Sequence, residues 1–131
     1  MEFTQNNFTT PLYVAILALI YMFLSSVVVY YRRKFSRGIG DGGNKTLHRA
    51  IRVHGNFIEY VPITLLLIFF VELSQVSPIY IHTMGLGLVV SRLLHAFGLL
   101  RYAGASPGRF IGTLLNFILI VFASCYLLIT F

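Results

Sequence analysis

The chain has 131 residues, of which 57% are hydrophobic and only 11% are charged. Together with a mean hydropathy of +0.82, this composition excludes an ordinary soluble domain. The formal net charge of +6 would suggest a nucleic-acid partner in a soluble protein. In a chain this apolar, the concentration of Lys and Arg on the cytoplasmic side of a membrane explains the charge better, and we expect no nucleic-acid partner.

Four apolar segments are each long enough to cross a bilayer, which takes about 20 residues of α-helix. They cover about residues 11–31, 47–73, 79–100 and 109–131. The sequence therefore predicts an all-α integral membrane protein, with a single four-helix bundle over residues 1–131. The glycine-rich segment between the first two helices lacks the βαβ setting of a phosphate-binding loop, and we interpret it as a flexible linker.

The third segment is rich in small residues. Gly87 and Ser91 are four positions apart, and Gly85 and Gly98 add further small surface. Small residues allow helices to approach closely in lipid. We therefore expect the third helix to lie at the centre of the packing.

The Lys and Arg residues all lie at or near the two connections that share one side of the bundle. They are Arg32, Arg33, Lys34, Arg37, Lys45, Arg49, Arg52, Arg92, Arg101 and Arg109. Because Lys and Arg favour cytoplasmic loops, both connections are expected in the cytoplasm and both termini on the other side.

Polar side chains recur inside the apolar segments. Arg52, Asn56 and Glu59 are spaced i, i+4 and i+7 along one helix face, and Arg92 and His95 share a face of the next helix. A charge at the bilayer centre costs about 2.5–3.5 kcal/mol on insertion scales, so such groups indicate a functional site by default. Arg109 begins the fourth segment on the same side. We expect a polar site at the cytoplasmic end of the bundle.

A purely structural network is one interpretation of these residues, because Arg and Glu can pair across helices and Arg can extend to the membrane surface. Three guanidinium groups against one carboxylate leave positive charge unpaired, which favours an anionic ligand. Glutathione fits, with two carboxylates for Arg forks and one ammonium for Glu59. Its thiol becomes a good nucleophile where positive charge lowers its pKa. No spacing resembles a zinc site, and no metal is expected.

The run from Arg52 to Pro62, RVHGNFIEYVP, resembles the second-helix signature of the MAPEG family. These are the membrane-associated proteins of eicosanoid and glutathione metabolism, and the signature reads Arg-x-x-x-Asn-x-x-Glu-Tyr-x-Pro. Residues 92–95, RLLH, are similar to the third-helix motif of prostaglandin E synthase, and residues 107–109, PGR, resemble the start of its fourth helix. The helix layout matches nearly the whole chain, and the motifs cover about residues 47–109.

The resemblance implies a homotrimer with glutathione at each subunit interface, near the cytoplasmic face. The residue near the sulfur, and so the catalytic one, is expected to be Arg109. The residues expected to bind glutathione are Arg52, Asn56, Glu59, Tyr60, Arg92 and His95. The implied activity is a glutathione transferase, with a related peroxidase activity, that acts on lipophilic electrophiles from the membrane lipid. Leu99 stands where the eicosanoid synthases carry a tyrosine, which argues against their chemistry.

Two other functions fit parts of the pattern. One is a non-enzymatic membrane trimer that binds glutathione or an anionic lipid as a scaffold or transporter. The other is a four-helix multidrug exporter, which is disfavoured because residues 11–31 lack the carboxylate that such exporters need in their first span. We expect the protein in a bacterial inner membrane, because the chain shows no organelle-targeting signal.

Reporter fusions test the predicted orientation. A reporter inserted within residues 38–44 is expected to behave as cytoplasmic, and one fused after Phe131 as non-cytoplasmic, because the basic residues mark the cytoplasmic side. Paired alkaline phosphatase and green fluorescent protein fusions measure this. The reverse pattern would place the polar site at the other face.

Overall fold

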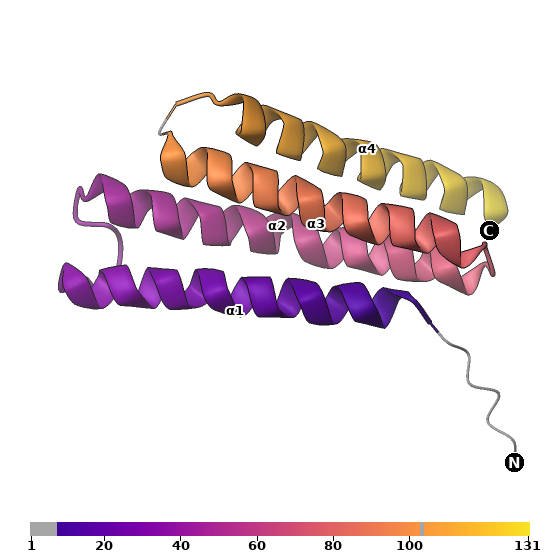
Figure 1. The fold of residues 1–131 in the computed structure, drawn as a ribbon, viewed down its shortest axis with the longest axis horizontal. Helices are drawn as coiled ribbons and strands as arrows, with labels where there is room; N and C mark the ends of the chain where they lie inside the picture. The colour runs from indigo at the N-terminus through magenta and orange to yellow at the C-terminus, as the bar shows by residue number, and fades with distance from the viewer. Residues whose placement is uncertain (1–7, 103) are drawn as a thin grey trace, which may run out of the picture.

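The computed structural model describes residues 8–102 and 104–131, which form four long helices side by side (Figure 1). They are α1 (Thr10–Lys34), α2 (Lys45–Leu73), α3 (Pro78–Arg101) and α4 (Pro107–Thr130). Each is long and apolar enough to cross a membrane, and the described residues contain no strand. All four predicted helices are present, with bounds within three residues of the prediction. The first seven residues, whose side of the membrane the charge pattern predicts, lie outside the described ranges.

Local signals in the sequence account for the helix starts. Proline occupies the first turn of α1, α3 and α4, where its missing N–H costs nothing. The Asn44 side chain accepts hydrogen bonds from the backbone N–H groups of Thr46 and Leu47, each at 3.0 Å, and so caps α2. Ser106 caps α4 by accepting from the Arg109 N–H at 3.3 Å. α2 continues through Pro62 without a break.

Large apolar side chains cover the outer surface of the bundle. Leu19 on α1 is 74% exposed, and Phe122 and Ile129 on α4 are 62% and 87% exposed. Such a surface is costly in water but matches hydrocarbon. The exposure pattern therefore agrees with a bundle whose outer faces contact lipid or further protein.

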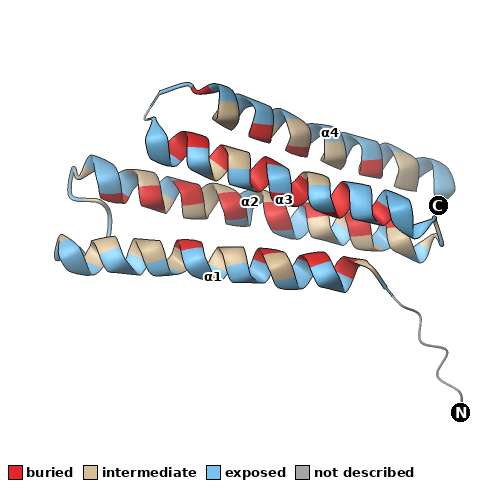
Figure 2. Cartoon of the chain, viewed as in Figure 1, coloured by how far each residue is buried: buried red, intermediate tan, exposed pale blue. Residues whose placement is uncertain are grey.

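α3 lies at the centre of the packing, as its small residues predict. Ten of its 24 residues are buried, against three of 24 in α4, and Figure 2 shows buried residues along much of its length. The backbones of α3 and α4 approach each other closely at two glycines. A Cβ added at Gly112 would lie 2.5 Å from the Ser91 carbonyl oxygen, and one at Gly98 would lie 2.6 Å from the Arg109 nitrogen. Only glycine fits at these two positions without separating the helices.

Glu72 joins α1 to the far end of α2. Its carboxylate accepts hydrogen bonds from the backbone N–H groups of Thr9 and Thr10, the latter at 2.9 Å. A carboxylate at a helix N-terminus satisfies free N–H groups and opposes the positive end of the helix dipole. This contact holds the start of α1 at the end of the bundle away from the basic loops.

The connection between α1 and α2 is held by its own side chains, although its glycine content suggested a flexible linker. The Arg32 guanidinium donates to the backbone carbonyls of Gly38 and Gly40 at 3.1 and 3.0 Å. Glycines at positions 40, 42 and 43 adopt positive φ angles, which other residues adopt only at a cost. The loop therefore has a defined course that ends beside the first turn of α2.

We expect Gly112→Ala to destabilise the bundle by about 1–3 kcal/mol, the range for overpacking. Its Cβ would meet the backbone of α3, which cannot move aside as a side chain can. Gly87→Ala is the matched control, because its Cβ would lie 3.6 Å from Leu119, an ordinary contact. Thermal unfolding in detergent, followed by circular dichroism, measures both. Equal midpoints for the two variants would contradict the close α3–α4 contact.

Candidate functional site

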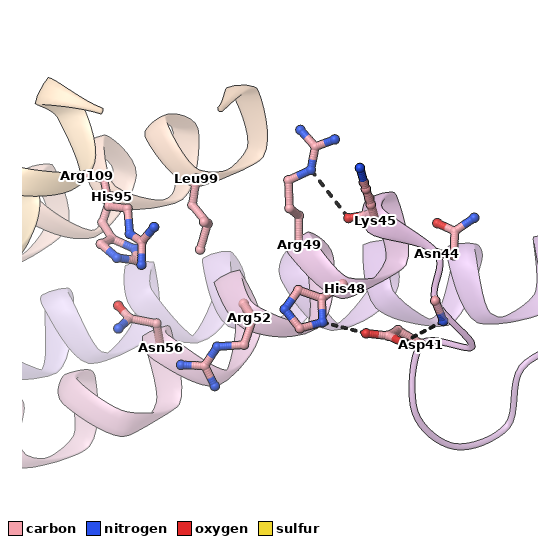
Figure 3. A pocket seen from close by; sticks show the side chains of 11 residues that line it. Asp41, Asn44, Lys45, His48, Arg49, Arg52, Asn56, His95, Leu99 and Arg109 are labelled. Atoms are coloured by element: carbon pink, nitrogen blue, oxygen red, sulfur yellow. Dashed lines mark hydrogen bonds and ion pairs between the residues drawn. The ribbon is translucent and has the colours of Figure 1, made fainter. Parts of the chain in front are cut away.

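A cavity of about 540 Å³ opens at the basic end of the bundle. Its walls come from α2, α3, the first turns of α4 and the loop before α2 (Figure 3). Four of the seven residues predicted for the site line it: Arg52, Asn56, His95 and Arg109. Leu99, at the position of the tyrosine in the eicosanoid synthases, lines it as an apolar wall. Residues more than 35 positions apart thus meet at one cavity, as predicted.

The cavity also includes residues that were not predicted for the site. Lys45 and Arg49 line it on α2, at i−7 and i−3 from Arg52 and so on the same helix face. Extending the Arg52–Asn56 spacing toward the start of the helix could have found them. The basic cluster of residues 32–37 in turn does not line the cavity.

Among the described residues that line the cavity, Asp41 is the one carboxylate. Hydrogen bonds from the Gly43 backbone N–H and from the His48 ring hold the pKa of Asp41 below its ordinary value of 3.8. Asp41 is therefore ionised at neutral pH and already paired. Lys45, Arg49, Arg52 and Arg109 leave the cavity positively charged, as an anionic ligand requires.

His95 is 5% exposed and lines the cavity beside Arg109 (Figure 3). No side-chain hydrogen bond joins it to another described residue. His54 and His82 differ, because they contact the Ser25 hydroxyl at 3.0 Å and the Tyr13 hydroxyl at 2.9 Å. Buried polar groups are normally paired, so the imidazole of His95 is available to a ligand in the cavity.

Arg92 lies behind the cavity wall and does not line it. It is 3% exposed. Its guanidinium donates to Asn56 Oδ1 at 2.9 Å, to the Gly112 carbonyl at 3.1 Å and to Ser91 Oγ at 3.2 Å. The same group stacks over the Tyr60 ring, 5.4 Å from its centroid. Within one chain, Arg92 and Tyr60 therefore contact each other and not the cavity.

Glu59 lies on the outer surface of α2 and not inside the bundle, where a buried carboxylate was expected. Its carboxylate is 3.7 Å from the Arg52 guanidinium, and the two side chains are 50% and 51% exposed. The reason is the direction of this helix face, which points partly out of the four-helix bundle beyond Arg52. Glu59 and the cavity thus share Arg52 as a common neighbour.

The described residues contain no group of three or more His, Cys, Asp and Glu side chains that could hold a metal ion. The side chains that line the cavity are mainly cationic, with the amides of Asn44 and Asn56, the imidazoles of His48 and His95, and the Asp41 carboxylate. Such a donor set can bind carboxylates and stabilise a thiolate.

Comparison with known proteins shows the family of the chain. The MAPEG family model matches residues 10–129, so the chain belongs to the MAPEG family. It is 39% identical over 89 residues to the inner membrane protein YecN of Escherichia coli strain K12, an alignment that covers 68% of each chain. YecN of Escherichia coli O6:H1 shows the same identity and coverage. No solved structure matches the chain.

Proposed function

We propose that this protein is a glutathione-dependent membrane transferase. The observation that carries the proposal is the cavity at the basic end, where Arg52, Asn56, His95 and Arg109 from three helices converge. Its volume of about 540 Å³ falls within the usual range for small-molecule sites, about 300–1,000 Å³. Glutathione, a peptide thiol with two carboxylates, matches the excess of positive charge.

The assignment of groups follows from their positions. Arg52 and Asn56 hold the polar backbone and carboxylates of glutathione, with His95 as a further partner on the α3 wall. Arg109 lies in the first turn of α4, where the positive end of the helix dipole adds to its charge. This combination stabilises a thiolate, which attacks a lipophilic electrophile that arrives from the bilayer. Reduction of lipid hydroperoxides by the same thiolate is the related peroxidase activity.

We propose a homotrimer, the assembly that the family resemblance implies, and the exposed Arg52–Glu59 pair supports the contact of another copy with this face. Two charged side chains, each about half exposed, lie on a helix that spans the membrane, and lipid is a poor solvent for both. A second copy packed against this face would cover the pair and leave Glu59 beside a bound ligand. In that assembly, Glu59 receives the glutathione ammonium and Tyr60 completes the same wall.

One observation favours a different function. Leu99 provides no hydroxyl at the cavity wall, so the tyrosine hydroxyl that the eicosanoid synthases carry at this position is missing here. A trimer that binds glutathione or an anionic lipid without chemistry, as a scaffold or transporter, has no need of that hydroxyl. Binding without conjugation of any electrophile would identify this alternative.

We place the protein in a bacterial inner membrane. Its relatives of the same family are named as inner membrane proteins of Escherichia coli. All four helices can cross a bilayer. The cavity then opens toward the cytoplasm, where the charge pattern puts the basic residues.

Glu59→Gln is expected to weaken glutathione binding by roughly 1.5–3 kcal/mol, the range for hydrogen bonds to charged groups. The oligomer should persist, because the amide keeps the size of the side chain. Isothermal titration calorimetry on purified protein gives the affinity, and Glu72→Gln at the other end of α2 is the control. Loss of the oligomer with unchanged affinity would show that Glu59 only pairs with Arg52.

Arg109→Ala is expected to lower turnover and move the pH–rate profile upward, because the thiol pKa rises toward that of free glutathione. Arg52→Ala is expected mainly to raise the KM for glutathione, as uniform binding predicts. Ultraviolet titration of bound thiolate and steady-state kinetics separate the two effects. An equal thiolate fraction in wild type and Arg109→Ala would remove Arg109 from its catalytic role.

A further inference from the structure

Arg92 is the most deeply buried charged side chain among the described residues, at 3% exposure. Its guanidinium bonds to one acceptor on each of α2, α3 and α4, namely Asn56, Ser91 and Gly112. All three acceptors are neutral, and no described carboxylate pairs with Arg92. A lysine could not reproduce this contact, because its single ammonium lacks the planar fork that reaches several directions at once.

The bond to Asn56 decides how that residue faces the cavity. An asparagine amide has one carbonyl oxygen and one NH2 group. Arg92 has only donors, so the oxygen of Asn56 must turn toward it, at 2.9 Å. Since Asn56 also lines the cavity, its NH2 group remains to face a ligand. The orientation of an amide is set by its hydrogen-bond network, and here Arg92 sets it.

The bond to Gly112 acts on the opposite wall. Gly112 lies three residues after Arg109, within one turn of α4. Its backbone packs directly against Ser91 and His95 of α3. One guanidinium thus holds α2 at Asn56 and α4 next to Arg109, from behind the cavity that these two residues line.

We propose that Arg92 is a positioning residue, which orients the Asn56 amide so that its N–H groups donate to an acceptor oxygen of the ligand. The family resemblance implies direct glutathione contact by Arg92, but in the single chain Asn56 lines the cavity and Arg92 does not. The acceptor is a carboxylate or amide carbonyl oxygen of the bound peptide. This inference rests on the proposed function for the identity of the ligand.

Asn56→Asp provides a sharp test. The carboxylate keeps the acceptor for Arg92, so thermal stability should stay equal or rise. It removes the N–H groups and places negative charge toward the ligand, so glutathione affinity should fall at least about tenfold. If Asn56 instead accepted from the ligand ammonium, Asn56→Asp would bind as well as wild type or better, and the proposal would be wrong.

Arg92→Lys and Arg92→Gln separate geometry from charge. If Arg92 acts by orienting Asn56, both variants should bind glutathione about tenfold more weakly than wild type. In an Asn56→Ala background, either change should cost little more. Retention of wild-type affinity by Arg92→Lys, or full additivity with Asn56→Ala, would mean that Arg92 acts through its charge alone.

Asn116→Leu controls for general loosening of the bundle. It removes the 3.5 Å hydrogen bond from Asn116 to Thr64, which joins the same two helices, α2 and α4, and Asn116 does not line the cavity. It should lower thermal stability and leave glutathione affinity unchanged. If it lowers affinity as much as Arg92→Gln, the effect of Arg92 is only structural.

Should the Arg92 variants fail to assemble, Ser91→Ala replaces them. The expected result is a loss of a few-fold in glutathione affinity, and an unchanged affinity would contradict the proposal.

A readout that needs no glutathione keeps the two proposals distinct. Leu99→Cys, in a Cys125→Ser background, places the single thiol at the cavity wall. The rate at which a small neutral maleimide labels this thiol should change several-fold when Arg92→Lys is added. The rate should stay constant when Asn116→Leu is added instead. A wild type that binds no glutathione would end the proposed function. The labelling rates would still decide the role of Arg92, and equal rates in all variants would overturn it.

Discussion

Hydrocarbon offers no hydrogen-bond partners, and this constraint shapes the whole bundle. Every polar group inside the membrane must find its partner within the protein. The guanidinium of Arg92 meets the constraint with acceptors from three helices. The helices must therefore lie close enough for one side chain to reach all of them. The site at the basic end depends on that closeness.

The close contact is made possible by glycine. Gly98 and Gly112 allow the backbones of α3 and α4 to meet where any Cβ would collide, and the Gly112 carbonyl becomes an acceptor for Arg92. The first turn of α4, with Arg109, is then held against the α3 segment that carries His95. Small residues in a membrane helix thus have two effects here. They allow dense packing, and they bring backbone carbonyls within reach of a buried cation.

On the outer face of α2, the polar groups do not all find close partners within a single chain. Arg52 and Glu59 satisfy one another only across 3.7 Å and remain half exposed. Arg52 belongs at once to this face and to the cavity. A ligand in the cavity and a neighbour on the α2 face would therefore act on the same guanidinium, which links the proposed binding site to the proposed assembly.

The sequence alone determined the four helices and the family. It also indicated at which end of the bundle the candidate cavity lies. Helix length in a bilayer, the distribution of Lys and Arg and the spacing of one motif are all local in the chain. Local spacing also selected Arg52, Asn56, His95 and Arg109, which the structure brings together at one cavity, and their part in ligand binding stays a prediction. It could not say that Glu59 faces outward, that Arg92 lies behind the wall, or that Lys45 and Arg49 belong to the cavity. A helical period shows which residues share a face, but the neighbour that each face meets depends on how the helices cross. The helices meet through contacts between residues distant in the chain, such as that of α3 with α4 at Gly98 and Gly112, which no local pattern reveals.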